Sequence, residues 1–335
     1  MKKNYIIIVI IVIIISAAAG SLLYWGRKAV QKPASQEPLK IAANVWPGYA
    51  YIFVAQEKGM FEKNGVGIEI SLFKNYSDSY KLYSSGQADG IIEVFSDVVL
   101  HNIENKPTKA VYAIDYSDEG DAIIGQSDLN YPQGLIGKKI GIDSFNSFSH
   151  LFVATILKQA NIKASEVELV EVPAYEVLNA LESGKIDIGH TWEPAKSMAL
   201  AKGYKQFDKA GNYPGLIIDV LSFSSEVILN READVQAVVK SLLEAKIFLD
   251  NNPSEAIAIM AKAENMSEAD MQNGLDGVYL LDKRDNQTAF SYSIGFESLH
   301  GTFRAINDFF REVGITDKIL DSTDYIDPRF IRRLQ

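Results

Sequence analysis

The sequence contains no cysteine among its 335 residues. This absence excludes a disulfide scaffold, a thiol nucleophile and a zinc or iron–sulfur site with cysteine ligands. Histidine is scarce as well, and the spacing of His101, His150, His190 and His300 does not indicate a metal site. We therefore expect no metal and no cofactor, and we expect each histidine to be solvated or part of the core.

Positive charge is in short supply. Lys and Arg total 33 against 43 Asp and Glu, which gives a formal net charge of -10. Residues 1–38 contain five of the basic residues and one acidic residue, so the remainder carries a net charge of -14. Phosphate binding needs concentrated Lys and Arg, so the sequence argues against a nucleic-acid partner. The acidic surplus instead favours a cationic or neutral polar ligand.

Long apolar runs are also lacking, except for one at the start of the chain. As a helix, residues 5–25 would span about 31 Å at roughly 1.5 Å per residue, which matches the hydrocarbon core of a bilayer. Residues 1–25 are therefore predicted to be a transmembrane anchor or a signal peptide cut after Ala17-Ala18-Ala19. The apolar stretch continues to the interfacial aromatics Tyr24 and Trp25, which favours the retained anchor.

Both alternatives export the remainder of the chain. We expect a cell-membrane protein whose main domain is held outside the cytoplasm by a single N-terminal anchor. If the segment is cleaved, the protein is secreted to the periplasm or the extracellular space. Residues 26–38 combine Pro, Ser and Gln with charged residues and are predicted to be a linker.

Short apolar segments alternate with helical patterns from residue 39 onward, which is typical of parallel α/β units. The alternation forms two series. The first predicts strands over 39–44, 67–73 and 90–95 and helices over 49–58 and 77–85. The second predicts strands over 139–142, 167–172 and 186–191 and helices over 148–160 and 175–183. Ser147 is available to cap the helix that follows it.

The second series repeats the first at a constant shift of 98 residues, so that residues 85–89 fall on 183–187. Two lobes of similar construction are therefore expected. Apolar stretches at 120–125 and 217–223 bracket the second series and predict two crossings between the lobes. The predicted domains are lobe 1 over 39–123 plus 222–335, with tail helices over 235–248, 254–264, 267–274 and 294–313, and lobe 2 over 124–221.

The same shift places two strand-to-helix turns, residues 45–49 and 143–147, in equivalent positions. Ligands of open α/β sheets bind beyond the carboxyl ends of the strands, where helix N-termini face them. We therefore expect both turns to face a cleft between the lobes. Trp46 and Tyr49 are predicted to form its wall, the alternative being a hydrophobic staple at the helix end.

Polar groups are concentrated in the second of these turns. Ser144, Asn146 and Ser147 offer hydroxyl, amide and N–H groups, which suit a carboxylate, sulfonate or phosphate. The alternative for these residues is helix capping alone.

Two further pairs follow later strands. Trp192 and Glu193 place an aromatic plane beside a carboxylate, which suits a cationic or amine-bearing group. The alternative is a packed Trp with Glu in solvent. Ser96 and Asp97 follow the strand at 90–95 and are predicted either to contact the ligand or to cap the next helix.

The remaining candidates lie near the crossings or after the second strand. Asp115, Asp121 and Asp219 are expected close to the cleft floor, where a structural role at the hinge is equally open. Tyr76 is a weaker aromatic candidate because it simply follows the second strand.

Short motifs recur in a characteristic order over residues 39 to 265. They are Asn44-Val45-Trp46-Pro47-Gly48-Tyr49 and the segments at 55–61, 85–89, 135–141, 180–187, 192–194 and 219–221. In this order and spacing the chain resembles the substrate-binding proteins of bacterial ABC transporters, in the class for nitrate, sulfonates, taurine and the pyrimidine precursor of thiamine.

The resemblance implies an α/β fold of the type II periplasmic-binding-protein kind, with two Rossmann-like lobes joined by two hinge strands and, here, preceded by an N-terminal transmembrane helix. It also implies a monomer without enzymatic activity that delivers a small molecule to an ABC permease in the membrane. The chain departs from the class in keeping an apolar N-terminal segment and in the acidity of its cleft candidates.

Three functions remain open on this basis. The leading hypothesis is a membrane-tethered binding protein for a zwitterionic aminosulfonate-like molecule or a nitrogen heterocycle, because nearby carboxylates would repel nitrate or bicarbonate. The alternative is a ligand-sensing ectodomain that works with a separate signalling partner. A pyrimidine-synthesising enzyme on the same fold is disfavoured, because those relatives depend on a cysteine-rich motif and this chain has no cysteine.

Overall fold

The computed structural model describes residues 37–334. The predicted anchor or signal peptide, residues 1–25, and residues 26–36 of the predicted linker lie outside the described residues. Among the helices within 37–334, none combines the length and the apolar character needed to cross a membrane. All elements named below belong to a compact unit that begins at Pro38.

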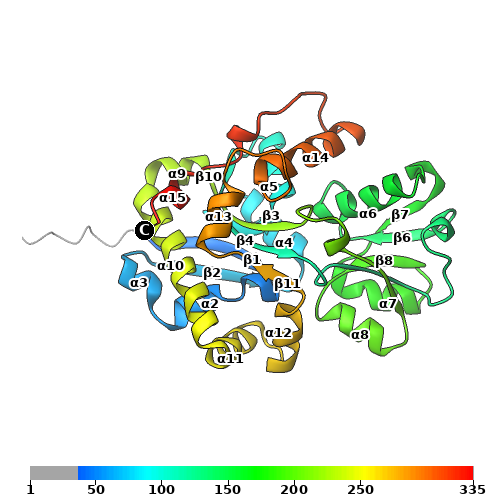
Figure 1. The fold of residues 1–335 in the computed structure, drawn as a ribbon, viewed down its shortest axis with the longest axis horizontal. Helices are drawn as coiled ribbons and strands as arrows, with labels where there is room; N and C mark the ends of the chain where they lie inside the picture. The colour runs from blue at the N-terminus through cyan, green and yellow to red at the C-terminus, as the bar shows by residue number, and fades with distance from the viewer. Residues whose placement is uncertain (1–36, 335) are drawn as a thin grey trace, which may run out of the picture. The chain divides into compact units, whose positions relative to one another are not determined.

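The first lobe is built on a six-stranded mixed sheet with the order β11-β4-β10-β3-β1-β2 (Figure 1). β1 pairs in parallel with β2 and β3, whereas β10 runs antiparallel to both β3 and β4. β1 is buried along its whole length except at Lys40, as expected for a parallel strand covered on both faces. The strands are β1 (Leu39–Asn44), β2 (Ile68–Phe73), β3 (Gly90–Val94), β4 (Thr108–Ser117), β10 (Ile218–Ser224) and β11 (Val278–Leu280).

The second lobe is built on a five-stranded sheet with the order β7-β6-β8-β5-β9. β6 is parallel to β7 and β8, and β5 is antiparallel to β8 and β9. Figure 1 shows α6 on one side of this sheet and α7 and α8 on the other. Its elements are β5 (Ala122–Gly125), β6 (Lys139–Ile142), β7 (Glu168–Glu171), β8 (Ile188–Thr191), β9 (Lys205–Lys209), α6 (Phe148–Gln159), α7 (Val177–Glu182) and α8 (Ala195–Ala201).

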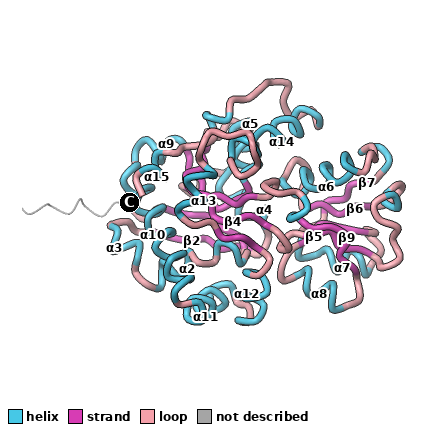
Figure 2. The backbone as a smooth tube through the Cα atoms, in the orientation of Figure 1, coloured by secondary structure: helices cyan, strands magenta, loops and turns pink. Residues whose placement is uncertain are grey.

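Helices cover both faces of the first sheet, with α2, α11 and α12 on one side and α5 and α14 on the other (Figure 2). They are α2 (Ile52–Glu57), α3 (Met60–Asn64), α4 (Tyr76–Ser84), α5 (Phe95–Ile103), α9 (Ser225–Asn230), α10 (Glu232–Asn251), α11 (Pro253–Glu264), α12 (Glu268–Leu275), α13 (Lys283–Ala289), α14 (Leu299–Glu312) and α15 (Arg329–Arg332). Two short 3-10 helices, η1 (Pro47–Tyr49) and η4 (Ala174–Glu176), follow β1 and β7 and precede α2 and α7.

The predicted α/β architecture with two lobes is confirmed, and the strands and helices of both series are present. The helix predicted over 49–58 begins three residues late, because Pro47 begins the separate turn η1 and α2 starts only at Ile52. The tail helix predicted from 294 begins at Leu299, where the side chain of Ser298 accepts the His300 N–H.

Two local expectations are wrong. Ser147 does not cap α6 with its side chain; its Oγ instead donates to the Ser144 carbonyl at 2.7 Å. Ser96 and Asp97 do not cap α5 either, because that helix begins at Phe95 and both residues lie inside its first turn.

The chain passes between the sheets twice. It leaves β4 at Ser117 and enters β5 at Ala122, and it returns from β9 to β10 through residues 210–217. The crossings were predicted at the apolar stretches 120–125 and 217–223. Most of each stretch forms a strand, β5 or β10, and the crossing lies directly before that strand. This arrangement places the carboxyl ends of β1 and β3 close to the strand crossings.

Candidate ligand-binding site

A small cavity of about 20 Å³ lies between the two sheets. That volume is room for about one water molecule. Of the thirteen predicted site residues, six line it, and they come from both lobes and from a crossing. The lining consists of Trp46, Tyr49, Tyr76, Val94, Asp121, Phe148, Trp192, Ile217 and Asp219.

Aromatic rings from the two lobes close this cavity. Tyr76 of the first lobe contacts Phe148 of the second with ring centroids 4.9 Å apart in an edge arrangement, and Trp192 at 6.5 Å. Phe148 and Trp192 are 5.7 Å apart. Trp192 is 2% exposed, and its indole N–H finds no acceptor among the described residues. An unpartnered buried donor is costly, so this N–H is available to a ligand.

Tyr76 is held in place by the first lobe. Its hydroxyl donates to Asp97 at 2.5 Å and accepts the Val94 N–H at 3.0 Å. Burial raises the pKa of Asp97 to about 7, although the hydrogen bond from Tyr76 opposes the rise. Ser96 donates to the same carboxyl group at 3.4 Å. Asp97 and Ser96 thus lie behind the cavity wall and position Tyr76.

Asp219 on β10 lines the cavity, and Asp115 on β4 lies behind it. The two residues are register partners on adjacent antiparallel strands, so their side chains leave the sheet on the same face, with Cβ atoms about 5 Å apart. The Trp46 indole N–H donates to Asp115 Oδ2 at 3.3 Å, and Oδ1 receives no N–H or hydroxyl from the described residues. Burial raises the pKa of Asp115 to about 7, and burial together with the Asp115 charge raises that of Asp219 well above its usual range.

Glu264 lies behind Trp46 of the cavity wall, and the sequence analysis missed it. It is the last residue of α11 and is 6% exposed; one oxygen accepts the Trp46 N–H at 3.1 Å and the other has no partner among the described residues. Burial raises the pKa of Glu264 to about 8. The signal was present, because Glu264 continues the buried stripe of Ile257, Met260 and Ala261 at helical spacing.

Asp121 lies in the first crossing, and its side chain contacts the second lobe. Its Oδ1 lies 2.9 Å from His190 Nε2, and His190 Nδ1 lies 2.8 Å from the Ser149 hydroxyl. The Ser149 oxygen also accepts the Asp143 N–H at 2.9 Å. His190 is therefore a core histidine, as expected, but it also joins α6 and β8 to the hinge.

Glu193 is placed differently from the alternative expectation of a carboxylate in solvent. It is 5% exposed, so it does not lie in solvent, yet it is not among the residues that line the cavity. Its carboxylate forms an ion pair with Lys196 at 2.9 Å and accepts the Ser197 N–H at 3.2 Å. These contacts occupy both oxygens, so a direct contact between Glu193 and a ligand remains a prediction.

The polar turn before α6 does not line the cavity either, although Phe148 directly after it does. The Asn146 N–H donates to His150 Nδ1 at 3.2 Å, and the N–H of Phe145 donates to the Glu171 carboxylate at 2.9 Å. A carboxylate already occupies part of this turn, which weakens its suitability for an anion. Ser144, Asn146 and Ser147 therefore also remain predictions.

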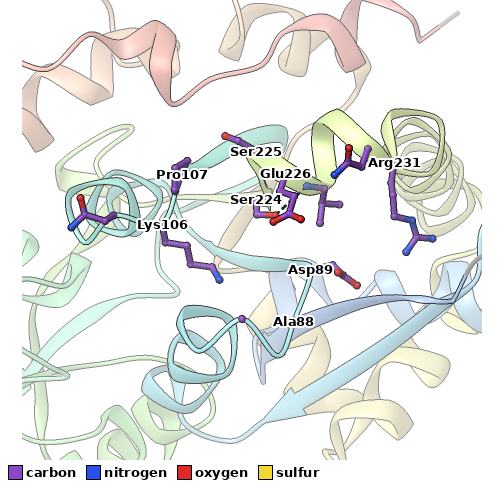
Figure 3. Close-up of a pocket in the computed structure, with 12 residues that line it drawn as sticks. Ala88, Asp89, Lys106, Pro107, Ser224, Ser225, Glu226 and Arg231 are labelled. Atoms are coloured by element: carbon purple, nitrogen blue, oxygen red, sulfur yellow. Dashed lines mark hydrogen bonds between the residues drawn. The ribbon is translucent and has the colours of Figure 1, made fainter.

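A larger hollow of about 580 Å³ lies elsewhere on the first lobe (Figure 3). Asp89, Lys106 and Ser224 are among the residues that line it. It adjoins the beginning of β3, whereas the cavity described above adjoins the end of the same strand. Ligands of α/β sheets bind at the carboxyl ends of strands, so the smaller cavity is the better candidate.

Comparison with known proteins places this geometry in context. A family model described as NMT1/THI5-like matches residues 46–256. The taurine-binding periplasmic protein of Escherichia coli K12 is 24% identical over 294 residues, which covers 83% of this chain and 88% of that protein. The formylaminopyrimidine-binding protein of Halalkalibacterium halodurans is 21% identical over 236 residues, which covers 67% of this chain and 70% of that protein.

Solved structures share the fold. The alkanesulfonate-binding protein of Xanthomonas axonopodis pv. citri, solved bound to MOPS, superimposes with a TM-score of 0.71 at 14% identity, covering 88% of this chain and 99% of that one. At this identity the likeness establishes the two-lobed periplasmic-binding-protein fold.

Proposed function

This chain belongs to the NMT1/THI5-like family, and we propose that it is the substrate-binding protein of an ABC importer. The observation that carries the proposal is the cavity at the carboxyl ends of β1 and β3, whose aromatic and carboxyl groups come from both lobes. Two lobes that meet around a small polar site are suited to close on a ligand and release it by hinge motion.

The ligand that suits this cavity carries a cationic or hydrogen-bond-donating nitrogen. Asp97, Asp115, Asp219 and Glu264 are buried, and none of them forms an ion pair within the part of the chain that the structure describes. Buried carboxyl groups without a cation favour a positively charged or donor-rich partner. Aromatic faces beside them add cation–π attraction.

Two ligand classes fit these requirements, a zwitterionic aminosulfonate-like molecule and a nitrogen heterocycle. Both classes have a counterpart among the relatives, whose names specify taurine and a formylaminopyrimidine. A simple anion such as nitrate suits the cavity poorly, because the carboxyl groups would repel it.

We also propose that the chain is tethered to the membrane beside its permease. The support is the apolar run at residues 5–25, which is long enough to span a bilayer. Membrane fractionation with N-terminal sequencing tests this point. An uncut protein in the membrane fraction is expected, and recovery of a soluble protein beginning near residue 20 would overturn it.

Thermal-shift screening of the full chain tests the binding function. The panel comprises taurine, a plain alkanesulfonate, nitrate, a primary amine and 4-(aminomethyl)pyrimidine. A ligand present at about 100 times its Kd adds about 2.7 kcal/mol to the free energy of unfolding. We expect a shift with taurine or with the pyrimidine, and a smaller shift in Trp192→Phe, which keeps an aromatic ring at this position but loses the indole N–H.

A shift with nitrate or the plain sulfonate alone would contradict the proposed ligand class. Asp128→Asn serves as a matched control, because Asp128 is an exposed carboxylate of the second lobe that is not part of the cavity. Its ligand-induced shift should equal that of the wild type.

A further inference from the structure

The hinge strands bring two carboxyl groups together. Asp115 and Asp219 are opposite one another on the antiparallel strands β4 and β10, so their side chains lie on the same face of the sheet with Cβ atoms about 5 Å apart. Asp115 is completely buried and Asp219 is 4% exposed. Two ionised carboxylates at such a distance repel each other strongly, whereas a pair that holds one proton is joined by a hydrogen bond.

The surroundings of this pair are acidic. The titratable groups that act on it or on its neighbour Tyr49 are Asp121 from the crossing, Asp97 from α5, Glu264 from α11 and Tyr175 from η4. Trp46 from the turn after β1 donates its indole N–H, and His190 is engaged with Asp121. No lysine or arginine forms an ion pair with any of these carboxyl groups in residues 37–334.

Two unpartnered polar groups indicate that a ligand completes this arrangement. Asp115 Oδ1, behind Asp219 of the cavity lining, receives no N–H or hydroxyl donor from residues 37–334. Trp192 Nε1, on a residue of the lining itself, has no acceptor among the same residues. One is an acceptor and the other a donor, and they come from opposite lobes. A small molecule with both a cationic nitrogen and an acceptor atom satisfies both.

We propose that Asp115 and Asp219 share one proton while no cation occupies the cleft, and that a cationic nitrogen of the ligand displaces this proton to solvent when it binds. Asp219, which lines the cavity, and Asp115 behind it then determine specificity together, because they exchange a proton for a cation. The inference rests on the proposed binding function and specifies the charge of the ligand group that meets the hinge strands.

Calorimetry of the full chain tests the exchange. Taurine and 4-(aminomethyl)pyrimidine, which both carry an ammonium group, are titrated at about pH 6 in phosphate and in bis-Tris. The buffers have different enthalpies of ionisation. The difference between the two binding enthalpies, divided by the difference between the two ionisation enthalpies, therefore gives the number of protons released. We expect release of up to about one proton in the wild type, and an affinity that rises by up to about tenfold per pH unit below about pH 7.

Asp115→Asn and Asp219→Asn remove the shared proton while keeping the shape of the side chain. Both variants are expected to release fewer protons than the wild type and to bind with a weaker dependence on pH, because the remaining carboxyl group has lost the neighbouring charge that favours its protonation. The use of two variants guards against a folding defect in either one. Asp327→Asn is the matched control, because Asp327 is equally buried but forms an ion pair with Arg329 at 2.6 Å. Its proton release should equal that of the wild type.

Infrared spectroscopy of the ligand-free full chain tests the shared proton separately. The protonated carboxyl band at about pH 6, to which Asp97 and Glu264 also contribute, should decrease on addition of a probe that binds, and it should be weaker in Asp115→Asn but not in Asp327→Asn. Binding without proton release would overturn the exchange and leave the proposed function standing. If neither ammonium probe binds, both the proposed ligand class and the displacement of the proton by a cation are wrong.

Discussion

At the scale of single residues, a buried carboxyl group makes stability depend on pH. Burial raises the folded-state pKa of Glu264 from 4.5 to about 8, so its contribution to stability is complete at acidic pH and is lost as the pH rises through the folded pKa. We therefore expect Glu264→Gln, which keeps the acceptor for the Trp46 N–H, to be more stable than the wild type at about pH 9. The gain is of order 1–4 kcal/mol.

Urea denaturation at about pH 5 and about pH 9 measures this difference. Near pH 5 the two proteins should be almost equally stable, because Glu264 is neutral there. Glu255→Gln is a suitable control, since Glu255 lies on the exposed face of the same helix. Equal stability of Glu264→Gln and the wild type at the higher pH would contradict the prediction, because it would mean that ionising Glu264 does not lower the free energy of unfolding.

Glu193 was predicted to bind the ligand, but its contacts also stabilise the fold. Its ion pair with Lys196 is nearly buried, with side-chain exposures of 7% and 9%, and the Lys196 ammonium also donates to the Glu119 carbonyl at 2.6 Å. Removing one partner of a buried pair costs roughly 3–5 kcal/mol, because the other charge stays buried. We expect Glu193→Ala to lower the free energy of unfolding by about this amount.

A double-mutant cycle with Lys196→Met separates the two roles. The double variant should be more stable than Glu193→Ala alone, because it no longer buries an unpaired ammonium. Denaturation curves of the four proteins give the coupling energy, and a value near zero would exclude the pair as a source of stability. Loss of ligand binding in Glu193→Ala is therefore informative only when the protein remains folded at the assay temperature.

Site residues could be predicted from the sequence where a side chain suited to ligand binding also follows a strand or lies at a crossing between the lobes. Trp46 and Trp192 follow strands, and the rule that ligands bind at the carboxyl ends of strands identifies them from sequence. Asp219 was identified instead from its position at a predicted crossing between the lobes. Phe148 was not predictable, because an apolar residue at a helix start has the pattern of a core residue. Glu264 was missed because it comes from a distant helix, and its place beside Trp46 depends on tertiary packing.

At the scale of elements, the turn between β1 and α2 sets the shape of the site. Gly48 lies in η1, and a Cβ at this position would overlap Asp115 Oδ2 and the Trp46 indole nitrogen. We expect Gly48→Ala to destabilise the protein by about 2–4 kcal/mol, in the range of overpacked or strained core positions, and to abolish ligand-induced thermal shifts.

Gly134→Ala is the matched control for that substitution. Gly134 also lies in a 3-10 turn, but its Cβ would meet only ordinary contacts at 3.5 Å or more. Thermal unfolding with and without taurine compares the two variants. A Gly48→Ala protein with wild-type stability and binding would mean that Asp115 and Trp46 can move apart without consequence.

Most elements were predictable because their apolar patterns are regular. The strand over 139–142 is found at the predicted residues, and the helix over 148–160 ends one residue early. Elements that depend on partners were not predicted. β11 consists of three residues that pair with the end of β4, and such a short edge strand has no periodicity of its own. The turns η1 and η4 include the first residues of the helices predicted over 49–58 and 175–183. A proline lies at or directly before the start of each turn.

At the scale of the whole molecule, the cavity imposes a requirement for motion. Its volume of about 20 Å³ is far too small for taurine or a pyrimidine, and rings from both lobes close it. A ligand can enter only if the lobes separate, and two strand crossings are suited to act as the hinge. We therefore expect the lobes to sample a more open arrangement in solution and to close around a ligand.

Paired spin labels at Met198 and Asn273 measure this motion. Met198 is exposed on α8, which follows Trp192, and Asn273 is exposed on α12, which packs against the turn that carries Tyr49. Because the chain contains no cysteine, labels attach only at the two introduced thiols. We expect a probe that binds in calorimetry to narrow the distance distribution and to shift it to shorter values. A second pair at Met198 and Lys163, both in the second lobe, should not respond. If the first pair is also unchanged by a bound probe, the ligand does not enter between the lobes, and a site on one lobe alone must be sought.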